Sequence, residues 1–439
     1  MKYRIHTMGC KVNQAESAAM AERLSAAGHV PCGASVPSLV VLNTCCVTAT
    51  AEKEAFQLLR RVRREHPGAK VVAAGCLAQL AGDRLLEGGL SDLVLGNSWK
   101  GLLADMAGSD DLGASAGKAY VDDGPDRGFA EAAPGPVSGR TRAFHKIQDG
   151  CSRSCSYCVI PSLRGPSRSL PEDRVLDGLK AIMDGGAAEC VLTGIHMGAW
   201  GSDLAPRAGL AGLLEAIERG LAPDPGRFRL RLSSLEPGEA VPLLRAFETM
   251  PFLAPHVHIS MQSAADPVLR LMRRPYTSDM CRRAAEAFAA RVEGVSIGAD
   301  LIAGFPGETE ADFLGGLELI RTLPLSYLHV FPFSERPGTR AAALPGAVPP
   351  EERRRRAREL KRIDREFRER FLRASCGREH LAVSENAFHR ASGRRRVLTG
   401  NYINALLPEG AEEPGGRLVR VRLGPSGNRW GLPEAEPCA

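Results

Sequence analysis

The first hundred residues of this 439-residue chain alternate short apolar runs with helical stretches, and this alternation restricts the fold more than any other feature. Short apolar strands that alternate with helices indicate a doubly wound parallel sheet. We therefore predict an α/β domain over about residues 1–135. Its expected strands and helices lie, in chain order, at residues 2–8, 13–28, 38–43, 48–68 and 69–75.

A second run of strand and helix signals begins near residue 141 and continues for more than two hundred residues. Repeated strand–helix units of this length favour a barrel or partial barrel, which we place at residues 140–375. Residues 101–140 are rich in Ala, Gly, Asp and Pro, so they are expected to end the first domain and to include a linker. Strands of the barrel are expected at 187–195, 227–235, 256–263, 295–305 and 327–334.

The last part of the chain opens with a basic helix, expected over about 350–374. Leu360, Ile363, Phe367 and Phe371 form its apolar stripe, and arginines cover the rest. The arginines form either a solvated helix face or a phosphate-binding surface, and the sequence leaves both readings open. Short strands then predict a small β-domain over 376–439.

Composition excludes several classes of protein. No apolar run is long enough to span a membrane, and the first residues lack the apolar stretch of a secretory signal, so we expect a cytoplasmic protein with no membrane partner. Twelve cysteines are too few for a disulfide scaffold in a chain of this length. In a reducing compartment, a tight cysteine cluster indicates a metal or catalytic site.

Cys151, Cys155 and Cys158 form such a cluster, with CxxxCxxC spacing. Structural zinc sites use four protein ligands, and ferredoxin runs continue to a fourth cysteine, whereas the residues that follow here offer none. Three thiolates on a four-iron cube leave one iron open, which can bind the amino and carboxylate groups of S-adenosylmethionine. An unusual zinc site is the alternative.

Cys10, Cys45 and Cys76 form a second group of three. Each follows one of the N-terminal strands, and the carboxyl ends of parallel strands share one edge of a sheet. Separations of about thirty residues fit one βα unit each, so the three thiols are expected to converge there. The alternative is three buried structural cysteines, because cysteine also packs as a small apolar residue.

Several stretches resemble the radical S-adenosylmethionine methylthiotransferases, and the resemblance covers nearly the whole chain. They include TMGCKVNQAES, NTCCVT, IQDGCSRSCSYCVIPSLRG, HVHISMQSAADPVLRLMRRPYT and GADLIAGFPGETEADF. GCKVNQ is most similar to the members that modify N6-threonylcarbamoyladenosine in tRNA. Other members act on isopentenyladenosine in tRNA or on a ribosomal-protein aspartate, and these remain alternatives. A non-catalytic, metal-binding RNA-binding module is the alternative of another class.

The resemblance implies two [4Fe-4S] clusters and S-adenosyl-L-methionine as cofactors. Cys151, Cys155 and Cys158 would hold the cluster that reduces S-adenosylmethionine to give a 5′-deoxyadenosyl radical. Cys10, Cys45 and Cys76 would hold the cluster that delivers methylated sulfur to carbon-2 of the adenine. The family pattern N-T-C-x-V selects Cys45, and Cys46 occupies the variable place, either as a core side chain or as a substitute ligand. Implied partners are the anticodon stem-loop of tRNA, an external sulfur source and an electron donor, and the C-terminal β-domain resembles the RNA-binding TRAM barrel.

The same resemblance suggests further contacts with S-adenosylmethionine. Tyr157 is expected near the adenine, Glu189 at the amino group, and Gln262 at the barrel mouth. The remaining expected contacts are Ser233, Ser234 and Glu236, which would reach the ribose or methionyl part, and Gly304 in a turn with Gly307 that lets the backbone approach the adenine. The alternative for each is turn capping or a satisfied buried polar group. His6, His196 and His256 are expected to be structural.

Overall fold

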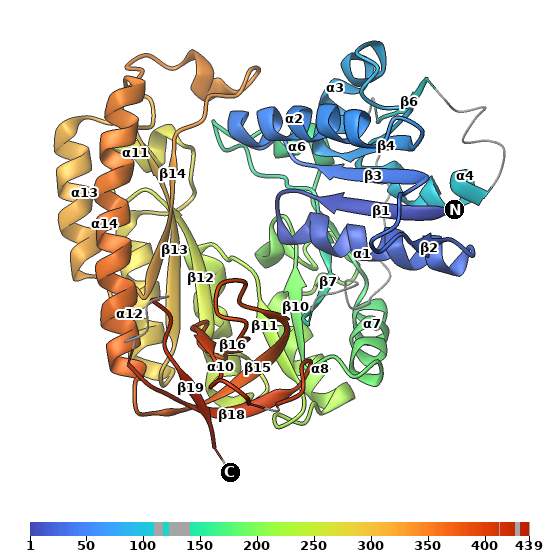
Figure 1. Cartoon of the computed structure of the whole chain (residues 1–439). Coiled ribbons are helices and arrows are strands. Elements are labelled where there is room, and N and C mark those ends of the chain that lie inside the picture. Colours follow the sequence, from blue (N-terminus) through green and yellow to red (C-terminus); the bar gives the residue numbers. More distant parts are fainter. Residues whose placement is uncertain (109–116, 123–140, 412, 426–430, 439) are drawn as a thin grey trace.

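A computed structural model describes residues 1–108, 117–122, 141–411, 413–425 and 431–438. The chain forms three parts, each built on its own β-structure (Figure 1). The predicted linker falls mostly on residues outside the described ranges, although β6 (Lys118–Tyr120) within it adds a sixth strand to the first sheet. No described helix is both long and apolar enough to cross a membrane.

The N-terminal part is a six-stranded parallel sheet in the order β2-β1-β3-β4-β5-β6. Side chains that alternate along its strands fill two separate cores. Val40, Leu42, Val71 and Ala73 face one way, toward the second and third helices, whereas the residues between them face the first and fourth helices. Its elements are β1 (Lys2–Thr7), α1 (Lys11–Ala26), β2 (Val30–Pro31), β3 (Leu39–Thr44), α2 (Ala49–Glu65), β4 (Lys70–Gly75), α3 (Cys76–Glu87), β5 (Leu93–Leu95), η1 (Asn97–Leu102) and α4 (Leu103–Gly108).

The central part is a partial barrel of six parallel strands. Two three-stranded sheets, β7-β10-β11 and β12-β13-β14, are joined by isolated bridges between Leu230 and Leu253 and between Leu235 and Ile259. The six strands are β7 (Ala143–Lys146), β10 (Glu189–Thr193), β11 (Arg229–Leu232), β12 (His256–Gln262), β13 (Ser296–Ala303) and β14 (Tyr327–Pro332). A separate antiparallel pair is formed by β8 (Gln148–Asp149) and β9 (Arg168–Ser169).

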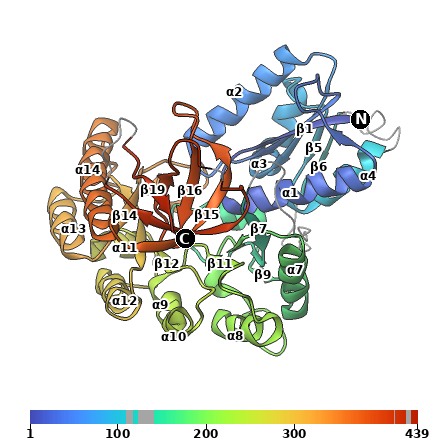
Figure 2. The ribbon, with the colours of Figure 1, turned by 60° about the horizontal axis from the view of Figure 1, so that its bottom comes forward.

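Helices cover the outside of this barrel, and α1 of the N-terminal part packs beside β7 at its edge (Figures 1 and 2). The helices are α6 (Ile160–Arg164), α7 (Glu172–Asp184), η2 (Met197–Ala199), α8 (Leu210–Leu221), α9 (Pro237–Ala240), η3 (Val241–Leu243), α10 (Leu244–Thr249), α11 (Asp266–Leu271), α12 (Ser278–Arg291), α13 (Glu310–Thr322), η4 (Arg340–Ala343) and α14 (Pro350–Ser375).

The C-terminal part is a curled antiparallel sheet in the order β17-β16-β15-β18-β19. Its strands are β15 (Glu379–Phe388), β16 (Arg395–Thr399), β17 (Asn404–Leu406), β18 (Leu418–Leu423) and β19 (Ala435–Pro437). This sheet lies against the amino ends of the barrel strands, where Arg229 and Arg231 of β11 donate hydrogen bonds to the carbonyls of Leu381 and Gly400 (Figure 2). The predicted α/β fold, with a parallel-sheet domain, a partial barrel and a small β-domain, is confirmed.

Candidate active site

The CxxxCxxC loop lies between β8 and α6, at the carboxyl end of the barrel. Hydrogen bonds from the Cys151 amide to the Gly165 carbonyl (3.0 Å) and from the Ser156 hydroxyl to the Leu271 carbonyl (2.7 Å) fix the loop to the barrel. All three thiols, from Cys151, Cys155 and Cys158, line one cavity of about 160 Å³. The loop therefore presents its three sulfurs to a common space.

Hydrogen-bond donors are directed at the sulfur atoms of this loop. The Arg274 guanidinium lies 3.0 Å from the Cys155 sulfur, and the Arg153 amide lies 3.4 Å from that of Cys151. Burial raises the pKa of Cys158 to about 12, so this thiol stays neutral unless a cation binds it. Sulfur ligands of iron–sulfur clusters accept such hydrogen bonds. The donor set therefore fits a [4Fe-4S] cluster with three protein ligands.

Four of the other predicted residues also line the cavity: Tyr157, Ser234, Glu236 and Gln262. Glu236 is buried and is bound by Arg153 at 2.6 Å and by Arg274 at 3.5 Å. The structure thus brings these side chains together with the cysteines.

Three predicted residues do not line this cavity. Glu189 begins β10 at the opposite end of the barrel, where Arg229 and Arg231 bind both of its carboxylate oxygens. Ser233 is buried and donates to the Met197 sulfur. The space that glycine leaves at Gly304 is occupied by Arg353 of α14, which a Cβ there would meet at 2.5 Å.

These positions differ from those expected for contacts with S-adenosylmethionine. Glu189 was assigned from its place before a strand, but a strand's first residue lies at the amino end of the barrel, away from the cysteine loop. Gly304 serves the close packing of a helix. We therefore leave Glu189, Ser233 and Gly304 out of the proposed site.

Sequence reasoning missed several residues of the cavity. His196, expected to be structural, hydrogen-bonds both the Cys151 sulfur, at 3.9 Å, and the Glu239 carboxylate, at 2.6 Å. Arg274, Arg153 and Ser260 also line the cavity. Arg274 stands in the stretch RRPYT, whose adjacent cations were the available signal. Its contact with Cys155 could not be predicted from the sequence, because Cys155 lies 119 positions earlier.

The second group of cysteines converges at the carboxyl edge of the N-terminal sheet. Cys10 directly precedes α1, Cys45 follows β3, and Cys76 is the first residue of α3. A positive φ at Gly9 lets the first loop approach Cys45, whose Cβ would be 2.6 Å from a Cβ at residue 9. Burial raises the pKa of Cys45 to about 11, and repulsion from Cys76 and Cys10 acts in the same direction. Helix N-termini favour thiolates, so this edge can hold a metal cluster.

Cys46, next in sequence to Cys45, lies in the apolar core that also contains Cys76. Its side chain is fully buried in the apolar core of the first domain, together with Phe56, Leu59 and Leu77. This environment agrees with the family pattern, which selects Cys45 and leaves Cys46 as a core residue.

A charged cluster joins the two cysteine groups. Arg164 of α6 donates to Glu16 of α1 at 2.9 Å and to Asp149 at 2.9 Å, and Lys146 and Lys100 also bind Glu16. All five side chains are buried. Opposite charges in contact compensate the desolvation of each, so the loop of Cys151 is fixed to the helix that begins after Cys10.

A second link runs through Asn97. Its amide donates to the Leu163 carbonyl of α6 at 3.0 Å and to the Cys76 sulfur at 3.8 Å. Val159 and Leu163, just after Cys158, are buried in the same apolar core as Cys76. The two cysteine groups are therefore held by neighbouring, interlocked segments.

Comparisons with known proteins agree with this geometry. The profile of the uncharacterized protein family UPF0004 matches residues 2–96, and that of the radical SAM superfamily matches 146–320. The threonylcarbamoyladenosine tRNA methylthiotransferase MtaB of Thermotoga maritima is 36% identical over 87% of this chain and 86% of its own. The chain belongs to the radical S-adenosylmethionine tRNA methylthiotransferases. The tRNA-2-methylthio-N(6)-dimethylallyladenosine synthase of Cereibacter sphaeroides (strain ATCC 17029) is 34% identical over 96% of this methylthiotransferase and 95% of its own chain.

Solved structures agree on the fold of this methylthiotransferase. The radical S-adenosylmethionine methyltransferase TsrM of Kitasatospora setae, with cobalamin and a [4Fe-4S] cluster, superimposes with a TM-score of 0.53 at 15% identity, covering 78% of this chain and 74% of its own. The cobalamin-dependent radical enzyme OxsB gives 0.52 at 13% identity, over 84% and 56%.

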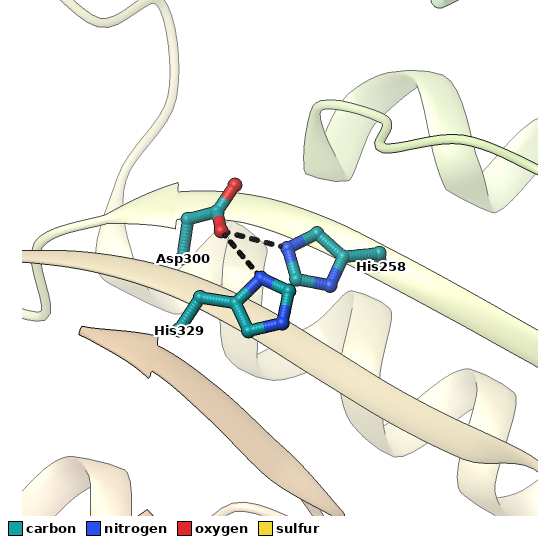
Figure 3. A group of neighbouring side chains, drawn as sticks. All are labelled: His258, Asp300 and His329. Atoms are coloured by element: carbon teal, nitrogen blue, oxygen red, sulfur yellow. Dashed lines mark ion pairs between the residues drawn. The ribbon is translucent and has the colours of Figure 1, made fainter. Parts of the chain in front are cut away.

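The barrel interior of the methylthiotransferase is polar at mid-height. His258 of β12 and His329 of β14 both approach one carboxylate oxygen of Asp300 on β13, at 2.9 and 3.3 Å (Figure 3). The Tyr327 hydroxyl forms a hydrogen bond, 2.9 Å long, with Nδ1 of His258, the ring nitrogen that does not face Asp300. Below them, Tyr402 of the C-terminal part stacks on His256, with ring centroids 4.5 Å apart. The C-terminal domain thus closes the lower end of the barrel.

The basic helix α14 carries two kinds of cation. Some arginines are bound to acidic side chains, and Arg356 is buried against Glu308 at 2.7 Å. In contrast, five exposed cations of α14 make no hydrogen bond or ion pair among the described residues. Arg373 lies near the end of the helix, and the spacing of four, three and four places the other four on one helix face. We call Arg354, Arg358, Lys361 and Arg365 the α14 stripe.

Proposed function

We propose that this enzyme transfers a methylthio group to carbon-2 of N6-threonylcarbamoyladenosine next to the anticodon of tRNA, using two [4Fe-4S] clusters and S-adenosyl-L-methionine. An external sulfur source and an electron donor complete the reaction. The observation that carries the proposal is the pair of three-cysteine groups joined through Arg164 and Glu16. Each group would leave one iron of a four-iron cluster without a protein ligand. The open iron of the first cluster would bind S-adenosylmethionine, and that of the second would bind the sulfur to be transferred.

The side chains around the first group suit a sulfonium cosubstrate. Cys151, Cys155 and Cys158 would hold a [4Fe-4S] cluster, which would supply the electron for reductive cleavage of S-adenosylmethionine. Glu236 and Gln262 offer polar groups to the methionyl and ribose parts. Tyr157 places an aromatic face at the adenine, and its ring is held edge-on to Phe305 at 6.0 Å.

Two surfaces are available for tRNA. The α14 stripe presents four uncompensated cations, which suits the phosphate backbone. The curled C-terminal sheet is the second surface, in keeping with its resemblance to TRAM domains. Contacts with the phosphate backbone do not distinguish one base from another. We therefore assign recognition of the modified base to the barrel interior.

Mass spectrometry of tRNA nucleosides tests the proposal. A strain that lacks this gene should lose 2-methylthio-N6-threonylcarbamoyladenosine, and the restored gene should return it. The second candidate substrate is dimethylallyladenosine, favoured by the 34% identity to an enzyme named for that nucleoside. Loss of the dimethylallyl product alone would overturn our choice, and loss of neither, with a change in a ribosomal protein, would exclude tRNA as the substrate.

A further inference from the structure

Lys11 follows Cys10 directly and is the first residue of α1. Residues four apart on a helix share a face, so Lys11 lies in line with Ala15 and Ala19. Both alanines are buried against Phe144 of β7 and Val191 of β10. The half-buried Lys11 side chain therefore lies at the end of the face of α1 that packs against the barrel, beside a ligand of the second cysteine group.

The ammonium group of Lys11 has no hydrogen bond or ion pair within the part of the chain that the structure describes. The charged groups that act on it most strongly are two other cations, Arg231 and Arg142, followed by Asp300 and Glu189. A cation among cations in a half-buried place is electrostatically unfavourable unless an anion joins it. Lys11 thus presents an ammonium group without an ion-pair partner in the described part of the chain, at the barrel-facing end of α1 and next to Cys10.

The two nearby carboxylates are already engaged. Glu189 is shared by Arg229, Arg231 and Arg142. Asp300 is bound by two histidines through the same oxygen atom (Figure 3). Neither carboxylate forms an ion pair with Lys11. The positively charged side chains around Lys11 therefore outnumber the carboxylates.

We infer that Lys11 binds the carboxylate of the substrate's threonyl group and thereby selects the nucleoside. This inference rests on the proposed function. The threonylcarbamoyl substituent ends in a free carboxylate, whereas the dimethylallyl substituent is a hydrocarbon with nothing for an ammonium group to bind. RNA phosphates are the other available anions, but every tRNA carries them on its outer backbone, and Lys11 lies beside Cys10, where carbon-2 of the base must meet the sulfur.

The test compares two synthetic anticodon stem-loops that carry threonylcarbamoyladenosine either as the free acid or as its methyl ester. The reconstituted wild-type enzyme should methylthiolate the acid with a KM about 10- to 100-fold below that of the ester, the range of a charged hydrogen bond. Lys11→Met should raise the KM of the acid to that of the ester, and Lys11→Arg should recover most of the preference. Lys70→Met, exposed at the far end of β4, is the matched control.

Three results would overturn the inference. The first is a wild-type enzyme that treats acid and ester alike, a measurement that needs no variant. The second is an equal loss on acid, ester and dimethylallyl stem-loops in Lys11→Met, which would assign the lysine to a phosphate. The third is an unchanged ratio of acid to ester in that variant. A wild-type enzyme that modifies neither acid nor ester would instead contradict the proposed function, so the two failures are distinguishable.

Discussion

Arg164 donates two hydrogen bonds to the carboxylate of Glu16, at 2.9 and 3.1 Å, from a position six residues after Cys158 to a position six residues after Cys10. The contact joins α6 of the barrel to α1 of the N-terminal sheet. Both side chains are buried, so the bond is shielded from solvent. It fixes the position of one cysteine loop relative to the other, and the proposed transfer of sulfur depends on that relation.

Arg164→Met should therefore separate the two halves of the reaction. The substitution removes the charged hydrogen bonds of Arg164 to Glu16 and Asp149, while Lys146 and Lys100 still compensate these carboxylates, so it is expected to cost about 1.5–3 kcal/mol of stability. Thermal unfolding should show this loss, and the amount of methylthiolated product per 5′-deoxyadenosine should fall. Arg219→Met, exposed on α8, is the control. An unchanged melting temperature and an unchanged product ratio would show that the contact does not position the loops.

The two cysteine groups should respond differently to substitution. Cys151→Ala should abolish formation of 5′-deoxyadenosine, because the first group supplies the radical. Cys45→Ala should keep part of this cleavage but stop sulfur insertion. Cys46→Ala is a matched control next in sequence, buried in the core, and should retain both activities. Equal loss of cleavage in Cys151→Ala and Cys45→Ala would refute the division of labour.

The α14 stripe should contribute to tRNA binding through phosphates. Serine at Arg354, Arg358, Lys361 and Arg365 should weaken binding and reduce the slope of log K against log[salt] by about one for each lost contact. The matched control is serine at Arg355, Arg362 and Arg368 on the same helix, since these arginines are bound to acidic side chains. Similar slopes for the two variants would show that the α14 stripe is a solvated helix face and does not bind phosphates.

His145 should make the fold sensitive to acid. Burial lowers its pKa to about 4, and its hydrogen bond to the Val175 carbonyl opposes this only partly. Because an unfolded histidine titrates near 6.5, the unfolded state binds more protons below that pH. Stability should therefore fall by about 1.4 kcal/mol per pH unit as pH drops from 6.5 toward 4.

Thermal unfolding of wild type and of His145→Gln, at pH 7 and pH 5, checks this expectation. The variant should lose less stability between the two pH values than the wild type does. His389→Gln, in a turn after β15, serves as the control. Parallel pH dependence in wild type and His145→Gln would rule out His145 as a source of the acid sensitivity.

Much of the fold could be predicted from local patterns. The N-terminal strands carry near-continuous apolar runs because both of their faces are buried, and their ends lie within about two residues of the expected positions. The convergence of Cys10, Cys45 and Cys76 followed from the parallel topology alone. In each case, the period of the sequence and the geometry of one supersecondary unit contain the information.

Other features depended on contacts between distant segments. Glu189 has the sequence context of a site residue, but three arginines of the barrel bind it. His196 and Arg274 reach the cysteine loop only because the barrel closes around it. The basic helix had two open readings because ion pairs within α14 and with α13 decide which arginines are free. The pairs within α14 join residues three or four positions apart and could be anticipated from the sequence, whereas the pairs with Glu308 and Glu310 depend on the packing of α14 beside α13.

The central claim is that two separate three-cysteine groups each hold a four-iron cluster. Iron analysis of the anaerobically reconstituted enzyme tests it most directly, in wild type and in variants with alanine at Cys10, Cys45 and Cys76 or at Cys151, Cys155 and Cys158. The account predicts about eight iron atoms per chain in wild type and about four in each variant. About four in wild type, with no change when Cys10, Cys45 and Cys76 are replaced, would contradict it.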